Sequence, residues 1–439
     1  MKRYERYKDS GVEWVGEIPE GWEVRKLKRA FSFATGFTPP TGQSEYYEGG
    51  NHIWINISDL KQKIVVESEK KITDKAIGDF QPEIVPKGSL LYSFKLSVGK
   101  VAFVSKPVYT NEAIFAVKPA EGLALDFFYY SLPMQIIINA NENIYGAKIL
   151  NQELIKNTDI LLPSREDQTA IANYLDRKTA EIDELIAQKE RLIELYEEEK
   201  TAIINQAVTK GIDPDARLKD SGIDWLGEIP EGWEVKRLRY VGNCQNGVSK
   251  GADYFGTGFP FVSYSDVYNN FVLPQNVEGL ANSTEIDQVN YSVIKGDLLF
   301  TRTSETIEEI GISSTCLETI NRAIFSGFLI RFRPFDGILF EGFSKYFFRS
   351  KLHRLFFVKE MNLVTRASLS QELLKRLPVI LPPFPEQCEI ASYLDRATSS
   401  IDAKIAKTKR IIELQKEYRT ALISEVVTGK IKVTEETAP

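Results

Sequence analysis

The chain of 439 residues contains few of the residues from which metal centres, disulfide frameworks and many catalytic sites are built. It has two histidines and three cysteines, and Cys244, Cys316 and Cys388 are far apart and form no C-x-x-C pair. This set predicts neither a zinc site nor a disulfide. We expect each cysteine to act as a small buried hydrophobic residue.

Long apolar runs are also missing. No uninterrupted stretch approaches the ~18 residues that a membrane span needs, and the N-terminal residues 1–6 lack the apolar core of a signal peptide. A cytoplasmic protein without a membrane partner is expected. Lys and Arg total 55 against 61 Asp and Glu, for a net charge of −6. Such a balance is not typical of a protein that binds DNA on its own.

Sequence motifs for catalysis are scarce as well. There is no P-loop and no glycine-rich dinucleotide turn after a strand. The run Leu381-Pro382-Pro383-Phe384 superficially resembles an amino-methyltransferase motif, but Leu381 stands where that motif has Asn or Asp and cannot accept the hydrogen bond of an amine. The chain is therefore predicted to be non-catalytic.

What the sequence does contain is an internal repeat. Residues 8–24 return as residues 219–235 with three conservative differences. A second block, residues 151–177, returns as residues 370–396, while the segments between the two blocks diverge. A period of about half the chain indicates a duplicated domain rather than a solenoid.

Each second block runs into a long charged stretch without Pro or Gly, from Asp167 to Thr209 and from Glu386 to Thr428. Apolar residues recur in both at close to coiled-coil spacing, which predicts two long helices that cover each other. Chain order makes them antiparallel, as a spacer within one chain; a dimerisation rod is the alternative. The predicted contact residues are Ile182, Ile186, Ile193, Tyr196 and Ile203 in the first helix and Ile401, Ile405, Ile412, Tyr418 and Leu422 in the second.

The divergent segments alternate short β-rich runs with Gly, Asn and Pro turns, which is typical of small mixed α/β domains. The predicted fold is α+β: two mixed α/β domains joined by two long helices that form an antiparallel coiled coil, with a pseudo-two-fold internal repeat. The predicted boundaries are 1–164 and 212–382 for the domains, 165–211 and 383–430 for the helices, and 431–439 for a C-terminal tail.

Polar and basic residues recur at matched places in the divergent segments, for instance Asn111–Phe115 against Asn321–Phe325. Lys and Arg suit phosphates and guanine edges, and Asn, Ser and Thr suit other base edges. Taken singly, each residue also fits a solvated surface position. The candidates are Thr35, Thr38, Asn56, Ser58, Lys95, Lys100, Asn111, Tyr145 and Lys148 in the first copy, and Ser249, Lys250, Tyr264, Ser265, Arg302, Thr303, Ser304, Asn321, Arg322, Thr365 and Arg366 in the second.

Three features together carry a resemblance to a known family. They are the Gly-Glu-Ile-Pro-Glu-Gly-Trp openings at 16–22 and 227–233, the Leu-Pro-Pro-Phe-Pro-Glu-Gln entry at 381–387, and the paired Ile-Ala-x-Tyr-Leu-Asp helices. Over nearly its whole length the chain resembles the specificity subunits of type I restriction-modification systems. The first copy departs at residues 163–168, which read Pro-Ser-Arg-Glu-Asp-Gln.

The resemblance implies that each variable domain is a target-recognition domain that reads one half of a bipartite, asymmetric site in double-stranded DNA, with the coiled coil setting the spacing. It implies two methyltransferase subunits that use S-adenosylmethionine, and motor-nuclease subunits in the full complex. This chain would hold no cofactor itself. Its negative charge predicts weak, salt-sensitive DNA binding without those partners.

Two other functions remain open from the sequence. One is a structural adaptor whose coiled coil docks proteins and whose domains bind no nucleic acid. The other is a fused subunit with cryptic nuclease or methyltransferase activity.

Overall fold

The computed structural model describes residues 2–95, 97–142, 148–304, 309–350, 352–360 and 367–433. Its contacts divide the chain within the two long helices into two compact units. Unit 1 consists of Met1–Gln188 and Ile411–Pro439, and unit 2 of Lys189–Arg410. The part of each unit outside the long helices is called its head. Each unit therefore holds one head and one part of each long helix.

The first head is built on a five-stranded sheet. In sheet order the strands are β4 (Phe33–Thr35), β11 (Ile114–Val117), β8 (Leu90–Ser93), β9 (Val101–Val104) and β6 (Ile64–Val65). All four residues are buried in each of two inner strands, β8 and β11, as expected for short continuous apolar runs. A three-stranded sheet lies in the same head, in the order β10 (Tyr109–Thr110), β5 (His52–Ile55) and β7 (Lys71–Ile72), with β5 and β10 parallel.

The second head repeats this plan with different side chains. Its four-stranded sheet has the order β18 (Gly242–Asn246), β25 (Leu329–Pro334), β21 (Leu298–Thr301) and β23 (Ser313–Thr315). A three-stranded sheet follows the order β20 (Leu280–Ala281), β19 (Phe255–Val262) and β24 (Ile324–Phe325), with β19 and β24 parallel. The predicted mixed α/β class is confirmed for both heads.

The two repeated sequence blocks of each head meet in space. Strand β3 (Glu23–Lys26), from the opening block, pairs with β14 (Asp159–Leu162), from the closing block. In the second head β17 (Glu234–Arg237) pairs with β27 (Pro378–Leu381) in the same way. In each head the opening and closing blocks therefore form a single frame. The divergent middle segment is attached to that frame.

Apart from the two long helices, the remaining strands and α-helices are mostly short, and the longest of them is α3. They are β1 (Tyr7–Asp9), β2 (Glu17–Pro19), α1 (Leu27–Ala30), α2 (Asp74–Phe80), α3 (Leu125–Ile138), β12 (Asn141–Glu142), β13 (Lys148–Ile149), α4 (Gln152–Lys156), β15 (Leu218–Asp220), β16 (Glu228–Pro230), α6 (Tyr264–Asn269), α7 (Glu285–Asn290), β22 (Thr303–Ser304), α8 (Glu341–Phe347), α9 (Leu352–Glu360), β26 (Ala367–Ser368) and α10 (Gln371–Lys375).

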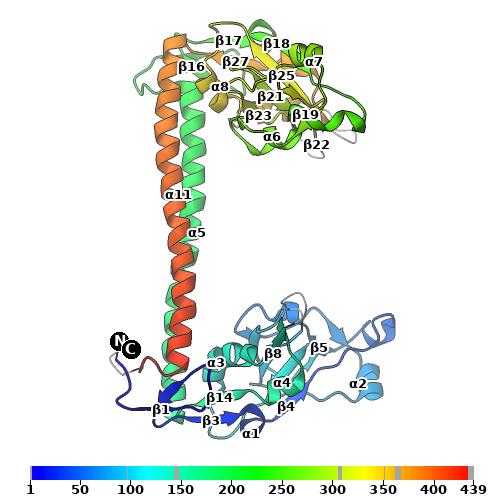
Figure 1. Ribbon diagram of the computed structural model, residues 1–439, viewed down its shortest axis with the longest axis vertical. Helices are drawn as coiled ribbons and strands as arrows, with labels where there is room; N and C mark the ends of the chain where they lie inside the picture. The colour runs from blue at the N-terminus through cyan, green and yellow to red at the C-terminus, as the bar shows by residue number, and fades with distance from the viewer. Residues whose placement is uncertain are drawn as a thin grey trace. The chain divides into compact units, whose positions relative to one another are not determined.

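The two long helices, α5 (Arg165–Lys210) and α11 (Phe384–Val427), lie side by side (Figure 1). In unit 1 the Asp183 carboxylate pairs with the Arg419 guanidinium at 2.9 Å. In unit 2 the Lys200 ammonium lies 2.7 Å from the carboxylate of Asp402. Residue numbers rise along one helix as they fall along the other, so the predicted antiparallel coiled coil is confirmed.

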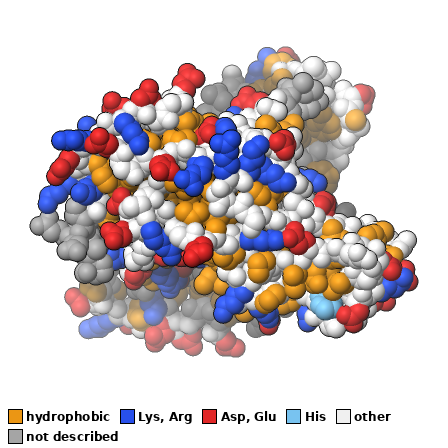
Figure 2. Space-filling view, turned by 90° about the horizontal axis from the view of Figure 1, so that it is seen from below, with side chains coloured by type: hydrophobic (Ala, Val, Ile, Leu, Met, Phe, Trp, Pro, Cys, Tyr) orange, Lys and Arg blue, Asp and Glu red, His pale blue; other side chains and the backbone are white. Residues whose placement is uncertain are grey.

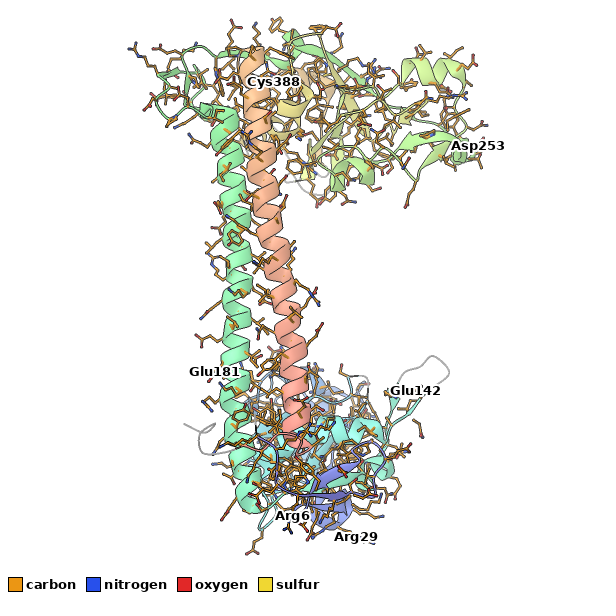
Figure 3. All side chains as sticks on the ribbon, turned by 60° about the vertical axis from the view of Figure 1, so that its left-hand side comes forward. Arg6, Arg29, Glu142, Glu181, Asp253 and Cys388 are labelled. Atoms are coloured by element: carbon orange, nitrogen blue, oxygen red, sulfur yellow. The ribbon has the colours of Figure 1, made fainter. Side chains whose placement is uncertain are left out.

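Burial along the pair only partly follows the predicted contact list. Ile182, Ile186, Ile401, Ile405, Ile412 and Leu422 are each at most 9% exposed, whereas Ile193, Tyr196 and Ile203 are half-buried. Tyr418 is 46% exposed and lies at the rim. Charged side chains such as Glu181 cover the outward surface (Figure 3).

The C-terminal end of α5 also packs into the core of the second head. Ile204, Ala207 and Val208 are buried in the core of the second head together with Trp233 and Leu238. The prediction named the neighbouring Ile203, which packs only at the edge of that core. The final turns of α5 therefore complete the core of the second head, to which the helix delivers the chain.

Candidate nucleic-acid interface

One glycine turn recurs in the two heads at the end of the first strand of the larger sheet. Gly36 donates its backbone N–H to the Ile114 carbonyl (3.4 Å), and Gly247 donates to the Leu329 carbonyl (3.3 Å). A Cβ at either glycine would collide with backbone carbonyl oxygens of the facing loop. Only glycine permits this close approach, which explains the glycine in both predicted loops.

The facing loop gives the true correspondence between the heads. The Asn111 N–H donates to the Ile55 carbonyl at the end of β5, and the Ser326 N–H donates to the Val262 carbonyl at the end of β19. Asn111 therefore corresponds to Ser326, and the predicted match of Asn111 with Asn321 is wrong. The two segments are similar in sequence, but which residues of the two heads correspond is determined by strand pairing and not by that similarity.

In the first head several candidate residues come together around this loop. The Asn111 Nδ2 donates to the Asn56 Oδ1 (3.3 Å), while the Asn111 Oδ1 accepts from the Ala113 N–H (3.2 Å). Thr35 is paired with Phe115 on the adjacent strand. This end of the sheet presents amide groups beside the exposed Glu112, a set that can both donate to and accept from base edges.

Other first-head candidates lie elsewhere. Thr38 is half-buried after the glycine turn; Ser58 and Lys95 are exposed. Lys100, also exposed, lines a cavity of about 640 Å³ between this head and the helix pair. Lys148 is ion-paired to Glu142 (2.5 Å). Tyr145 lies outside the described residues.

In the second head the loop between β24 and β25 brings together Ser249 and Arg302. The Arg302 Nη1 donates to the Gly327 carbonyl (3.4 Å), and Ser249 packs so closely on Gly327 that no Cβ fits there. Next to Gly327 along the chain is Phe328, a residue that the sequence prediction missed and that is 63% exposed. Its signal in the sequence, an aromatic at the start of an apolar strand, looks like an ordinary core position.

A second group in this head gathers on α7. The Arg322 guanidinium carbon lies 3.6 Å from the centre of the Phe259 ring, and its Nε donates to the Gln288 Oε1 (2.9 Å). Lys250 lies 5.8 Å from the Tyr254 ring. Burial raises the pKa of Tyr254 to about 12, and its hydrogen bond to the Asp287 carboxylate contributes a smaller part of this shift.

The remaining second-head candidates are dispersed. Tyr264 stacks on the Tyr268 ring, with centroids 5.9 Å apart, in the first turn of α6. The Ser265 hydroxyl lies 2.9 Å from that of Ser263. Thr303 is half-buried and Asn321 exposed. Ser304 belongs to β22, while Thr365 and Arg366 lie outside the described residues.

Each head is joined to the helix that leaves it by a tyrosine–aspartate contact, which we call the joint. The Tyr130 hydroxyl of α3 donates to Asp176 of α5 (2.5 Å), with the Lys63 ammonium on the same oxygen. The Tyr346 hydroxyl of α8 donates to Asp395 of α11 (2.6 Å). Burial, reinforced by the carboxylate, raises the pKa of both tyrosines above the usual value, so both remain donors.

The comparisons with known proteins agree with this duplicated plan. The chain matches the model of the type I restriction modification DNA specificity domain over residues 19–195 and 230–415. The chain belongs to this family. Its relatives include the MjaIX specificity subunit of Methanocaldococcus jannaschii, 25% identical over 96% of each chain, and the EcoKI specificity subunit of Escherichia coli K12, 24% identical over 94% of this chain and 91% of that one.

Solved structures share the fold of this specificity-domain protein. A chain from a structure described as the assembly and conformational transition of the type I R-M system superposes with a TM-score of 0.65 at 17% identity, covering 94% of this chain and 99% of the other. The HsdS subunit of Thermoanaerobacter tengcongensis gives a TM-score of 0.57 at 18% identity, with 94% and 98% coverage.

The repeated Gly-Trp opening of each specificity domain holds the ends of the helix pair. The Trp22 indole N–H donates to Asp167 at the start of α5 (3.2 Å), and its ring packs on Gly429 after α11. In unit 2 the Trp233 indole donates to Glu386 (2.9 Å) and packs on Gly211. The glycines, with φ of +75° and +78°, allow the chain to turn away after each helix.

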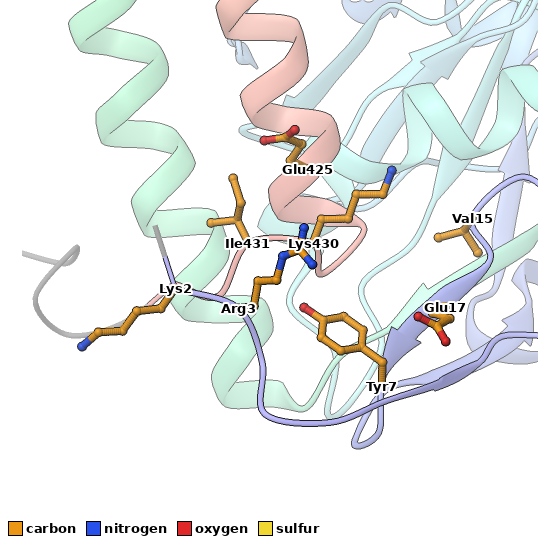
Figure 4. A pocket seen from close by; sticks show the side chains of 8 residues that line it. All are labelled: Lys2, Arg3, Tyr7, Val15, Glu17, Glu425, Lys430 and Ile431. Carbon is orange, nitrogen blue, oxygen red and sulfur yellow. The ribbon is translucent and has the colours of Figure 1, made fainter.

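We call this contact of the tryptophan with the helix ends the Trp clamp. In unit 1 the residues near the two chain termini add to it. The Lys432 N–H donates to the Lys2 carbonyl (2.9 Å), and the Tyr7 hydroxyl donates to the Gly429 carbonyl (3.0 Å). Beside them lies a cavity of about 420 Å³ (Figure 4). Its lining carries both signs of charge: Lys2, Arg3, Tyr7, Val15, Glu17, Glu425, Lys430 and Ile431. A cavity of similar volume lies at the matching end of α5 in unit 2.

The surface charge is mixed. On the face shown in Figure 2, Lys and Arg side chains lie among Asp, Glu and hydrophobic ones. Among the described residues no group suited to hold a metal ion is found, and none of the helices they form is long and apolar enough to cross a membrane. The three cysteines are free; Cys316 is buried, whereas Cys244 and Cys388 are only partly buried, contrary to the expectation for those two.

Proposed function

We propose that this chain is the DNA specificity subunit of a type I restriction-modification complex, with each head reading one half of a bipartite, asymmetric site in double-stranded DNA. The observation that carries the proposal is the duplication. Both heads have the same loop, held by the same glycine turn, but the loops display different side chains. Glu112 and Ala113 of the first head stand where the second has Gly327 and Phe328. Two different reading surfaces imply two different half-sites.

The helix pair sets the distance between the half-sites in this proposal. Each helical residue adds about 1.5 Å along the axis, so one heptad adds about 10 Å, or three base pairs at 3.4 Å per base pair. Inserting seven residues into each helix, at matched positions, should lengthen the unread gap and leave both half-sites unchanged. An unchanged gap in the methylated sites would contradict the spacer role.

The partners follow from the duplicated frame. Two matched helix ends, each closed by a Trp clamp and each beside a cavity, suit two copies of one partner. We assign these partners as methyltransferase subunits, with motor-nuclease subunits in the full complex, acting in the cytoplasm. Methyl transfer with S-adenosylmethionine and DNA cleavage then reside in the partners, and this chain is non-catalytic and holds no cofactor. Tritiated methyl transfer should require the methyltransferase subunits; transfer by this chain alone would contradict this division.

The net charge of −6 and the mixed surface support sharing of the DNA contact. Phosphate neutralisation supplies much of the affinity of proteins for DNA, and partners that close around the duplex can provide it. The chain alone should bind its site weakly and lose binding steeply with salt. Tight, specific binding at physiological salt without partners, measured by gel shift, would argue against this sharing.

Exchange of one head is the decisive test. Residues 238–366 are replaced by the corresponding segment of another family member, and the methylated sites are mapped by methylome sequencing. One half-site should change while the other and the gap remain. A matched exchange of residues 27–148 should change the other half-site only. If neither exchange altered methylation, the chain would be an adaptor that reads no DNA.

A further inference from the structure

We infer that Phe328 is a specificity-determining residue of the second head, whose ring contacts the 5-methyl group of a thymine in the major groove. This inference rests on the proposed function and goes further by naming the residue that makes the contact, the base that it recognises and the group of the base that it touches. An exposed phenylalanine by itself proves little, because single apolar side chains are common on surfaces. This phenylalanine differs from such residues in the rigid backbone that carries it, in the polar groups near it and in the residue that the other head has at its position.

The mounting is rigid. The Phe328 N–H donates to the Ser326 hydroxyl (3.2 Å), and the Phe328 carbonyl accepts from the Arg302 N–H (2.9 Å). On either side, the Gly327 N–H donates to the Val248 carbonyl (2.8 Å) and the Leu329 N–H to the Ser326 carbonyl (2.9 Å). The ring therefore projects from a loop whose backbone is fixed to two sheets, which is how a contact residue is pre-organised.

The surroundings match a base edge. Arg302 is fixed on both sides of its own backbone, because its carbonyl also accepts from the Leu369 N–H (2.7 Å). Its guanidinium lies against the Gly327 carbonyl, and the exposed Ser249 also packs on Gly327. The loop thus carries an exposed apolar ring next to Gly327, a residue that a guanidinium and a hydroxyl both contact. Thymine is the base that shows a methyl group in the major groove, and apolar side chains recognise it there.

The first head shows that the scaffold does not need this ring. There the Phe94 N–H donates to the Ala113 carbonyl (3.0 Å), as the Arg302 N–H does to Phe328. Ala113 therefore occupies the position of Phe328 and is 5% exposed, against 63% for the phenylalanine. The same loop folds around alanine, so the large ring in the second head serves something outside the fold.

The test uses the complex with its methyltransferase subunits and a duplex carrying the site found by methylome sequencing. Each thymine of the second half-site is replaced in turn by deoxyuridine, which removes only the methyl group. At one position the affinity of the wild-type complex should fall about fourfold, the loss expected for one methyl group returned to water. In the Phe328→Ala complex the same replacement should change affinity by less than about 1.5-fold.

Two variants serve as controls. Phe328→Leu keeps an apolar contact and should keep the sensitivity to uracil. Phe335→Ala, at another phenylalanine of the same head that is 44% exposed, should behave as wild type. A melting temperature of Phe328→Ala equal to that of wild type shows that its head is folded.

Three results would overturn the inference: a second half-site without any A·T pair, no thymine at which uracil weakens the wild-type complex, or full uracil sensitivity in Phe328→Ala. None of these would affect the head-exchange experiment. If instead head exchange fails to change the methylated site, the proposed function itself has failed.

Discussion

The joint between head and helix allows a quantitative prediction. Tyr346→Phe removes one hydroxyl from a side chain that is 6% exposed and leaves its ring in place. The hydroxyl donates to the Asp395 carboxylate at 2.6 Å and lies 3.1 Å from the Thr398 hydroxyl, which keeps its bond to the Leu394 carbonyl. Hydrogen bonds to charged groups contribute about 1.5–3 kcal/mol. Because the Asp395 side chain is 51% exposed and keeps its ion pair with Lys345, we expect the lower limit, about 1.5 kcal/mol.

The assay is urea unfolding followed by circular dichroism. A loss of about 1.5 kcal/mol corresponds to roughly a tenfold change in the folding equilibrium of the unit that contains the joint. Tyr346→Phe should shift the unfolding of unit 2, and Tyr130→Phe the unfolding of unit 1. Tyr418→Phe, at a ring that is 46% exposed, is the matched control and should change neither.

A double-mutant cycle isolates the contact. In an Asp395→Asn background, Tyr346→Phe should cost about 1 kcal/mol less than in wild type. Equal costs in both backgrounds, or a cost below about 0.5 kcal/mol in wild type, would refute the view that this hydrogen bond holds the head on its helix. If the joint also orients the head, the Tyr346→Phe complex should methylate sites with a wider range of gap lengths.

Other predictions concern the second head and the helix pair. Asp297→Ala should lower the free energy of unfolding by about 3 kcal/mol, because the Asp297 carboxylate is fully buried and accepts hydrogen bonds from Nε (2.6 Å) and Nη2 (2.7 Å) of Arg333. A change within error in urea unfolding would contradict this. Ile405→Ala should cost about 3 kcal/mol by leaving a cavity between the helices, with a lower melting temperature as the measurement. Gly211→Ala should cost about 1–2 kcal/mol, because its φ is +78°. Gly232→Ala, where a Cβ meets nothing within 4 Å, should leave the melting temperature unchanged. Equal melting temperatures for the two variants would show that the positive φ of Gly211 does not require glycine.

Much of the fold could be predicted from local patterns. The repeat of residues 8–24 at 219–235 indicated two copies of one frame, and heptad-like spacing indicated two long helices. The structure confirms both, with α5 at Arg165–Lys210 and α11 at Phe384–Val427. Periodicity succeeds here because burial on one face of a helix repeats at a fixed interval along the chain. It was less reliable at Tyr418, whose spacing fits the stripe but whose side chain reaches solvent.

The candidate interface was predictable only in part. Gly36 and Gly247 mark matching turns, and the structure brings Asn56 near Asn111, and Ser249 near Arg302. Comparison of sequences alone could not establish the register after those turns, because contacts between distant strands determine which residues face the same space.

The sequence by itself determined that this protein has two alike frames, two unlike heads and a helix pair between them, because those properties are written in repeats and periods along one chain. The tertiary structure alone decided that Asn111 corresponds to Ser326, that Tyr346 meets Asp395, and that the ring of Phe328 faces solvent while Leu329 beside it is buried. The physical reason is that each of these depends on which distant backbone and side-chain groups satisfy one another's hydrogen bonds, and separation along the chain does not encode that choice.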